Sequence, residues 1–328
     1  MKTDFEYQIN EYMVYCHSRQ LRPKTMMSYE ATLRLFEKWC KDVMKVTDLA
    51  KVNESMVRKY ITHLQERGKY TFYSNDKKKG INCPERRRDY DQPLSVVCIN
   101  NYLRNLKVFF HWLEEDFVIS KDPTKKIKLL KHERKAKEYM NDEDCKKLMS
   151  KFNKSYYPEY RDFAITMLLM DTGMRLGECC CLKVDDIDLK GRSILLKAEI
   201  TKGRQDRVVF FSAKTEIHLR RWLHFKDRYV ESDALFPMKH NGEAITISAF
   251  ERNFKGYLNR ADIKGNYSPH CLRNNFAKRC LMNGMDIYTL SRILGHSSVT
   301  VTEKAYLDLT DEDLCKRYQS FSPVSSIF

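Results

Sequence analysis

The chain lacks any apolar run close to the ~20 residues that a helix needs to cross a bilayer. Its first residues, MKTDFEYQINEYM, carry acidic side chains early and lack the apolar stretch of a signal peptide. Internal repeats and low-complexity tracts are missing as well. These absences argue against membrane, secreted and repeat proteins, so we expect a cytoplasmic globular protein that binds no membrane.

The chain has 11 cysteines but lacks a C-x-x-C pair. The number is odd, and Cys179, Cys180 and Cys181 are consecutive. Because successive residues on a helix point in different directions, this triplet cannot form a compact set of metal ligands. Reduced cysteines that pack as small hydrophobic residues explain the pattern, and we expect neither disulfides nor a metal.

Acidic residues are in deficit. Lys and Arg total 59 against 44 Asp and Glu, which gives a formal charge of +15. Such a surplus indicates a polyanionic partner, usually nucleic acid. Ribosomal proteins and repressors have a similar balance, so the charge predicts binding and not catalysis.

The first third of the 328 residues predicts a small domain of four helices over residues 1–118. The first helix covers about 4–17, and Pro23 opens a second that runs to about Lys41. The third follows Asn53 and is expected to end at Gly68. The fourth extends from Ser95 to about Phe117.

Residues 67–92 look like an insertion into this domain. They contain the basic triplets Lys77–Lys79 and Arg86–Arg88. Either the segment is a solvated loop, or the triplets contact a phosphate backbone. Residues 119–138 form a basic linker, because eight basic and three acidic residues lie between Lys121 and Tyr139. A linker of this charge is either a soluble connection or a strap that lies along DNA.

Residues 139–328 predict a second domain that is mostly α with a small antiparallel sheet. Helices are expected from Asn141 or Asp142 onward and over about 159–171. A strand, a break and a second strand follow in GRSILLKAEI, TKGRQDR and VVFFS. Further helices are expected over the ranges 214–228, 247–260, 271–283, 287–294 and 300–309.

Polar motifs occur in this second domain in a distinctive order. They are TGMRLGE at 172–178, ITKGRQDR at 200–207, PHCLRNNF at 269–276 and LGHSSVTVTEKAY at 294–306. In this order and at these separations they resemble the Arg, Lys, His-x-x-Arg, His and Tyr motifs of the tyrosine recombinase (phage integrase) family. One such motif is weak, but the ordered set is specific.

The resemblance extends over nearly the whole chain except residues 67–92. CLKVDDIDL and NGMDIYTLSRILGHSS match the helical framing of the family, and the segment 95–113 looks like the last helix of its core-binding domain. The resemblance implies an N-terminal helical, SAM-like core-binding domain and a C-terminal catalytic domain that form a C-shaped clamp on DNA. Asn274 departs from the usual residue after the second arginine, which affects local packing rather than chemistry.

Carried onto this sequence, the family motifs assign Tyr306 as the nucleophile that attacks a DNA phosphate. A tyrosine ester conserves the energy of the phosphodiester without a metal or a nucleotide cofactor. Arg175 and Arg273 are expected to bind the non-bridging phosphate oxygens, because guanidinium is a permanently charged, bidentate donor. Glu178 is expected to orient Arg175.

Lys202 is expected to be the general acid at the leaving 5′ oxygen, although Lys197, Arg204 and Arg207 compete for that role. His270 and His296 are expected to contact the phosphate and to assist proton transfer from Tyr306. The residues do not say which histidine is the base. A zinc site that includes His270, Cys271 and His296 is an alternative, but it lacks any short paired spacing.

The implied partner is duplex DNA with inverted-repeat core sites. Its backbone has six candidate contacts, namely Lys24, Arg104, Lys107, Arg134, Lys135 and Lys137. The family also implies a homotetramer on DNA, formed from free monomers or dimers, in which the C-terminal tail with Leu314, Tyr318 and Phe321 is exchanged between protomers. Accessory DNA-bending factors are possible further partners.

The leading function is site-specific recombination through a 3′-phosphotyrosyl intermediate for the integration or excision of a mobile element. The size resembles Xer recombinases that lack an arm-binding domain, so the alternative is resolution of chromosome or plasmid dimers. Relaxation of supercoils in the manner of type IB topoisomerases and non-catalytic DNA binding are further alternatives.

Overall fold

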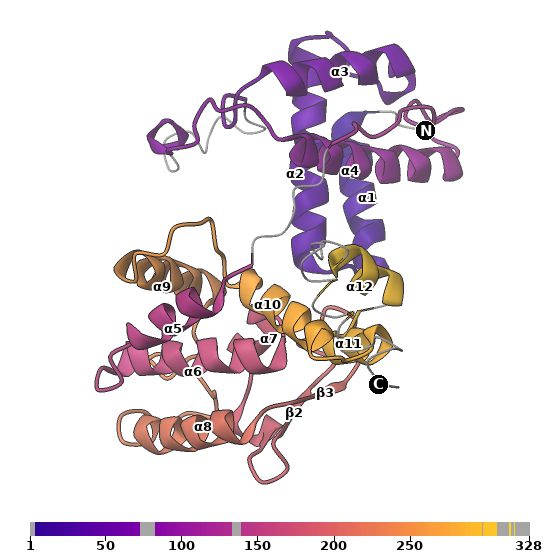
Figure 1. The fold of residues 1–328 in the computed structure, drawn as a ribbon. Coiled ribbons are helices and arrows are strands. Elements are labelled where there is room, and N and C mark those ends of the chain that lie inside the picture. Colours follow the sequence, from indigo (N-terminus) through magenta and orange to yellow (C-terminus); the bar gives the residue numbers. More distant parts are fainter. Residues whose placement is uncertain are drawn as a thin grey trace. The chain divides into compact units, whose positions relative to one another are not determined.

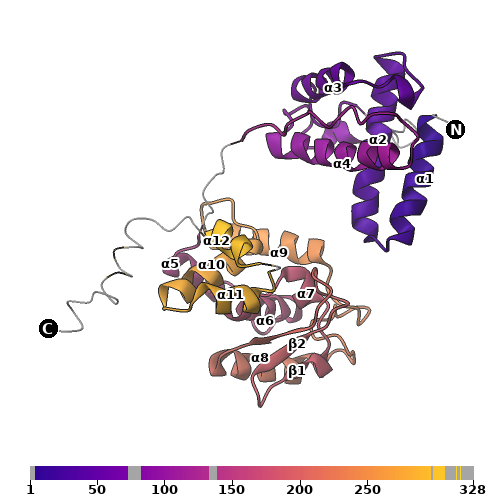
Figure 2. The ribbon, with the colours of Figure 1, turned by 90° about the vertical axis from the view of Figure 1, so that its right-hand side faces the viewer.

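The computed structural model describes residues 4–72, 83–132, 139–296 and 298–306, together with Cys315 and Tyr318. The chain divides into two compact units, Met1–Arg134 and Lys135–Phe328, which are treated separately below. The expected fold class, mainly α with a small antiparallel sheet, is confirmed (Figures 1 and 2). Within the described ranges, no helix combines the length and the apolar character that crossing a membrane requires.

The described residues of the first unit form four α-helices, as expected. They are α1 (Phe5–Ser18), α2 (Pro23–Asp42), α3 (Glu54–Glu66) and α4 (Val96–Glu115), with short 3-10 turns η1 (Leu49–Lys51) and η3 (Pro84–Arg86). Helices α1 and α2 run side by side, and α4 crosses them (Figures 1 and 2). Phe36 of α2 joins the helices, because its ring lies edge-on against those of Tyr60 and Phe110, with centroids 4.9 and 5.8 Å apart.

Local caps explain where these helices begin. The side chains of Asn53 and Ser95 accept hydrogen bonds from backbone N–H groups three residues ahead, at 3.1 and 3.2 Å. Asp4 does the same at the start of α1. Pro23 occupies the first position of α2, where its missing N–H has no helical partner to lose.

The ends of the predicted insertion are joined by backbone hydrogen bonds. Lys69 N–H donates to the Gln92 carbonyl at 2.8 Å, and Asp91 N–H donates to the Lys69 carbonyl at 3.0 Å. Helix α3 ends two residues before Gly68, with Arg67 as its extended cap. Gly68 therefore has another role than the expected cap: a Cβ there would lie 2.6 Å from the Asp91 Cα, so only glycine permits this approach.

The second unit is built around α6 (Tyr157–Thr172), which is buried along most of its length. Helices α10 (His270–Met282) and α8 (Ala213–Lys226) lie on opposite sides of it (Figures 1 and 2). The described residues of this unit also form α5 (Asp142–Ser150), α7 (Leu176–Cys180), α9 (Ile247–Arg260), α11 (Ile287–Leu294) and α12 (Val299–Tyr306). Asn141 caps α5 by accepting from Asp144 N–H at 2.7 Å.

The small sheet has three antiparallel strands in the order β1-β2-β3. Strands β2 (Ser193–Leu196) and β3 (Arg207–Phe210) correspond to the two expected strands and pair with Leu195 opposite Val208. The third strand, β1 (Ile187–Asp188), follows the 3-10 turn η4 (Val184–Asp186) and was not expected. Two residues are too few for an alternating pattern to be recognised.

A buried carboxylate joins α6 to α9. Asp162 is fully buried and accepts from the Arg161 guanidinium at 2.9 and 3.0 Å. Its other oxygen accepts from Asn253 at 2.8 Å and from the Tyr257 hydroxyl at 2.7 Å. Burial and the adjacent Asp162 charge raise the pKa of Tyr257 far above its ordinary value of 10.0, so this phenol remains a hydrogen-bond donor.

Candidate active site

The carboxyl end of α11 collects three arginines from distant parts of the second unit. The carbonyl of Ile293 accepts from Arg207, that of Leu294 from Arg273 and that of Gly295 from Arg175. The last carbonyls of a helix have no partner within the helix and carry the negative end of its dipole. This end therefore attracts guanidinium groups and holds them in one place.

Arg273 is the most enclosed of the three. It projects from α10, and only 3% of its surface is exposed. One guanidinium nitrogen, Nη1, donates to the Gly173 carbonyl at 2.7 Å, and Nη2 donates to Leu294 at 2.8 Å. Nη2 also lies 3.0 Å from Nε2 of His296. Two helix carboxyl ends and an imidazole thus determine where this charge lies.

Gly173 and Gly295 make the arrangement possible. Both end their helices in the left-handed conformation, with φ of 62° and 64°. A Cβ at Gly173 would lie 2.2 Å from the Phe276 ring, and a Cβ at Gly295 would lie 2.8 Å from Cδ of Arg207. The two glycines therefore turn their carbonyls toward the arginines at points where any side chain would collide.

Glu178 connects Arg175 to Arg207. Its Oε1 accepts from Arg175 Nη1 at 2.9 Å and from Arg207 Nη1 at 3.0 Å. Its Oε2 accepts from the Arg175 backbone N–H at 2.8 Å and from Arg207 Nη2 at 2.5 Å. Glu178 thus contacts both Arg175 and Arg207, and its role in orienting Arg175 stays a prediction.

The charge state of Glu178 follows from its surroundings. Its side chain is only 2% exposed, and burial by itself opposes ionisation. Hydrogen bonds and charge from Arg207 and Arg175 outweigh that penalty, so the pKa of Glu178 lies below its ordinary value of 4.5. The carboxylate is therefore ionised at neutral pH.

His296 lies between Arg273 and α12. Its Nε2 lies 3.0 Å from Arg273, and its Nδ1 lies 2.7 Å from the Thr302 hydroxyl. Thr302 is fully buried and belongs to α12, the helix that ends at Tyr306. The backbone of Tyr306 thus lies one turn beyond a direct contact with the arginine site, while its side chain lies outside the described residues.

The other two predicted site residues lie at the edge of this cluster. His270 is the exposed first residue of α10, one turn before Arg273 on the same helix face. Lys202 is exposed in the turn between β2 and β3. A cleft of about 610 Å³ is lined by Gly203 and Gln205 of that turn together with His296.

The structure therefore brings Arg175, Glu178, Arg273 and His296 into one hydrogen-bonded cluster. Arg207 and Thr302 also belong to the cluster, and the sequence analysis did not assign them these roles. Arg207 was considered only as a competitor of Lys202. In the sequence, Arg207 is the last residue of the expected break TKGRQDR, directly before the second expected strand, and no motif marks Thr302.

The competing residues of the turn have other contacts. Lys197 pairs with Asp186 at 2.6 Å, and this ion pair holds the pKa of Lys197 above its ordinary value. Arg207 is engaged with Glu178, as described above. Lys202 is exposed, and its role as general acid stays a prediction.

The candidate DNA-backbone residues are only partly described. Lys24 and Arg104 are exposed in the first unit. Lys107 is half-buried and donates to the Thr124 carbonyl at 2.6 Å, so it also holds the segment after α4. Arg134, Lys135 and Lys137 lie outside the described residues, as does the triplet Lys77–Lys79. In the second triplet, Arg87 stacks over Tyr70, 4.3 Å from the ring centre.

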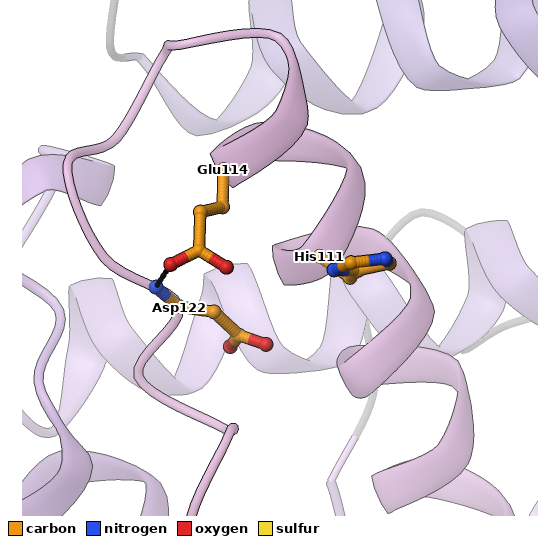
Figure 3. Close-up of side chains that lie close together, drawn as sticks. All are labelled: His111, Glu114 and Asp122. Atoms are coloured by element: carbon orange, nitrogen blue, oxygen red, sulfur yellow. Dashed lines mark hydrogen bonds between the residues drawn. The ribbon is translucent and has the colours of Figure 1, made fainter.

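Among the described residues, one group has ligand atoms close enough for a metal, namely His111, Glu114 and Asp122 in the first unit (Figure 3). Glu114 accepts from the Asp122 backbone N–H at 3.1 Å, and Asp122 accepts from Thr124 at 2.6 and 2.7 Å. These contacts fold the chain back after α4, which explains the carboxylates without an ion. Within the described part of the chain, His270, Cys271 and His296 form no such group.

Comparison with known families agrees with this site. Residues 138–313 match the phage integrase family, and residues 9–75 match the N-terminal SAM-like domain of phage integrases. This chain is a member of the phage integrase family, whose enzymes are tyrosine recombinases that cleave and rejoin DNA. The expectation of a recombinase is thereby confirmed at the level of the family.

Curated relatives cover nearly the whole chain. Tyrosine recombinase XerC of Pediococcus pentosaceus is 27% identical over 317 residues, which are 94% of this chain and 95% of that protein. Tyrosine recombinase XerD of Listeria monocytogenes is 26% identical over 310 residues, with 93% and 94% covered.

Solved structures share the fold at lower identity. The Tn1549 transposon integrase in complex with circular intermediate DNA is 19% identical, with a TM-score of 0.70 over 95% of this chain and 98% of that one. XerH recombinase bound to difH substrate has a TM-score of 0.68 and 21% identity, and the match covers 94% of this chain and 82% of XerH.

Proposed function

We propose that this protein recombines duplex DNA at specific sites, with Tyr306 as the nucleophile of strand cleavage. The observation that carries the proposal is the cluster of Arg175, Arg273 and His296 at the carboxyl end of α11, which Thr302 connects to the helix of Tyr306. The similar Tn1549 and XerH structures are complexes with DNA, which supports duplex DNA as the substrate.

In the proposed first step, the phenol oxygen of Tyr306 attacks the scissile phosphorus and forms a 3′-phosphotyrosyl ester. The bond from phosphorus to the 5′ oxygen breaks. The phenol proton passes to His270 or His296, and Lys202 gives a proton to the leaving 5′ oxygen. The 5′ hydroxyl of a second strand then attacks the ester, releases Tyr306 and rejoins the DNA. One phosphodiester replaces another, so no cofactor is consumed.

Arg175 and Arg273 would bind the two non-bridging oxygens of that phosphate. Negative charge on these oxygens increases in the pentacoordinate transition state, and donors held in place beforehand stabilise it by about 3–4 kcal/mol each. The carbonyl and carboxylate contacts described above fix both guanidiniums before DNA arrives. Little reorganisation is then needed at the moment of reaction.

The assembly is a further part of the proposal. Residues 1–118 and 139–328, joined by the basic linker 119–138, would form a C-shaped clamp around DNA. Four protomers on inverted-repeat sites would exchange their C-terminal tails, with or without DNA-bending factors. Similarity to a transposon integrase supports a mobile element as the substrate, whereas the XerC and XerD relatives support dimer resolution. Either substrate is cellular DNA, so we place the reaction in the cytoplasm.

The test is covalent trapping. The full chain is incubated with a library of randomised duplexes that each carry one nick, so that cleavage near the nick releases a short strand and prevents rejoining. Denaturing gels should reveal a protein–DNA adduct for the wild type and for Tyr288→Phe, a matched control at an exposed tyrosine of α11. Tyr306→Phe should form no adduct yet retain DNA affinity, because one hydroxyl is lost. An adduct in Tyr306→Phe, or none in the wild type, would contradict the proposal.

A further inference from the structure

The turn between β2 and β3 is closed by one buried side chain. Thr201 is only 2% exposed, whereas the residues that follow it, 202–206, are all exposed. Its hydroxyl donates to the Gln205 carbonyl at 2.9 Å and accepts from the Gln205 backbone N–H at 3.2 Å. A carbonyl can only accept and an N–H can only donate, so both roles of this hydroxyl are determined. One side chain therefore binds both backbone groups of Gln205 and joins the two sides of the turn.

The backbone inside this closure is strained. Arg204 has a φ of 51°, in the left-handed region that residues other than glycine seldom adopt. Its backbone N–H donates to the Thr201 carbonyl at 3.3 Å. A conformation of this kind persists only where the surrounding contacts impose it, and such residues are concentrated at functional sites. Thr201 supplies contacts of this kind, through its carbonyl to Arg204 and through its hydroxyl to the next residue.

The closed turn is connected directly to the arginine cluster. Two residues beyond its end, Arg207 begins β3 and donates to Glu178 at 3.0 Å. Thr201 and His296 line the same cleft of about 610 Å³. Lys202 follows Thr201 directly in the chain. The backbone point from which the Lys202 side chain extends is therefore held close to the proposed phosphate site.

We propose that Thr201 is a positioning residue for Lys202: its hydroxyl closes the turn and holds the Lys202 backbone where the ammonium reaches the leaving 5′ oxygen. This inference rests on the proposed function and deepens it, because it names the side chain that prepares the general acid before DNA binds. Lysine carries its charge on a flexible four-carbon stem, so only its backbone can be fixed in advance. Misplacing a reacting group by about 1 Å costs on the order of 10²-fold in rate.

A purely structural Thr201 would stabilise the hairpin without any link to the chemistry of the leaving group. Thr201→Val keeps the shape of the side chain and removes the hydroxyl, whereas Thr201→Ser keeps the hydroxyl. Thr166→Val is the matched control, because Thr166 is a fully buried threonine of α6 whose hydroxyl donates to a backbone carbonyl at 2.7 Å. Urea denaturation of the full chain establishes that each variant is folded.

The first measurement is amide hydrogen exchange of the free full chain, followed by NMR. In the wild type and in Thr201→Ser, the Gln205 amide should exchange more slowly than in the unfolded chain. In Thr201→Val its exchange should be faster than in the wild type by roughly 3- to 10-fold, which corresponds to the loss of one hydrogen bond. A Gln205 amide that exchanges in the wild type as fast as in the unfolded chain would overturn the inference. This test needs no DNA, so its result does not depend on the proposed function.

The second measurement is the single-turnover rate of adduct formation on the nicked duplexes, with oxygen or sulfur at the 5′ leaving position. A thiolate leaves without an acid, so sulfur removes the need for Lys202. On oxygen, Thr201→Val should be slower than the wild type by roughly 10- to 100-fold. On sulfur it should be within about threefold of the wild type, as Thr201→Ser and Thr166→Val should be on both substrates.

A double variant separates positioning from general stabilisation. Combining Thr201→Val with Lys202→Ala should give a rate no slower than that of Lys202→Ala alone, because both changes act on the same proton transfer. The positioning role is overturned, while the function stands, if Thr201→Val reacts as fast as the wild type on oxygen, is slowed equally on both substrates, or multiplies the defect of Lys202→Ala. A Lys202→Ala defect that sulfur does not restore would overturn the acid assignment and this inference together. Absence of any wild-type adduct would instead count against the function.

Discussion

Replacing Glu178 by glutamine removes one charge from the centre of the arginine cluster and leaves its shape nearly unchanged. Each carboxylate oxygen accepts two hydrogen bonds, from Arg175 and from Arg207. Whichever oxygen becomes an NH₂ group loses both and faces two donors. Hydrogen bonds to charged groups contribute about 1.5–3 kcal/mol each, so two losses amount to roughly 3–6 kcal/mol. The penalty for breaking a buried ion pair, about 3–5 kcal/mol, agrees with this range.

The matched control is Glu216→Gln in the same unit. Glu216 pairs with Arg220 at 2.8 Å, a distance similar to those in the cluster, but the Arg220 side chain is 59% exposed. Exposed pairs contribute about 0–1 kcal/mol, so this variant should be nearly as stable as the wild type. Urea denaturation of the full chain, followed by amide hydrogen exchange in α6, reports on the second unit in both variants.

The difference in free energy of unfolding between the wild type and Glu178→Gln should also depend on pH. In the folded protein the pKa of Glu178 is lower than its value near 4.5 in the unfolded chain. The ionised carboxylate therefore contributes stability that is fully present above the unfolded pKa. This stability is lost as the pH falls through the folded pKa. The two proteins should therefore converge in acid. A Glu178→Gln variant within 1 kcal/mol of the wild type at pH 7, or a difference that does not change with pH, would refute the central role of this carboxylate.

Three further predictions concern the glycine cap, the general acid and the DNA contacts. Gly295→Ala should destabilise the second unit by about 1–3 kcal/mol in urea denaturation, because its φ of 64° strains alanine and the new Cβ meets Arg207. The control is Gly256→Ala in the open middle of α9, which should stabilise the unit slightly. Lys202→Ala should slow adduct formation by about 10²- to 10⁴-fold, and sulfur at the 5′ leaving position should restore the rate, because a thiolate leaves without an acid. No restoration would argue against Lys202 as the acid, and Lys197→Ala is the control. Log affinity for duplex DNA should fall with log salt at a slope of about −0.9 per neutralised phosphate, and a flat profile would contradict backbone contacts.

The parts of the fold that depend on local signals could be predicted from the sequence. The helices after Asn53, Ser95 and Asp286 start where short polar side chains cap them, within a residue or two of the expected bounds. The two longer strands were recognisable from their β-branched and aromatic residues. Helix α7 and strand β1 were missed, because five and two residues are too few for a period to appear.

In the candidate site, too, some residues could be predicted from the sequence and others could not. The ordered motifs predict Arg175, Arg273 and His296 as site residues from residue type and spacing alone. The carbonyls of Ile293, Leu294 and Gly295 could not be predicted as a common anchor, since backbone groups leave no trace in residue identity. Arg207 and Thr302 act through tertiary contacts of ordinary side chains, and only coordinates reveal which partners they meet.

The most direct test of the proposed chemistry is to locate the covalent bond itself. The adduct trapped on nicked duplexes is digested with nuclease and protease, and the modified peptide is sequenced by mass spectrometry. We predict a nucleotide attached through its 3′ phosphate to Tyr306, with a free 5′ hydroxyl on the released strand. A nucleotide on any other residue, or a 5′-phosphate linkage, would contradict the assignment of Tyr306 as the nucleophile.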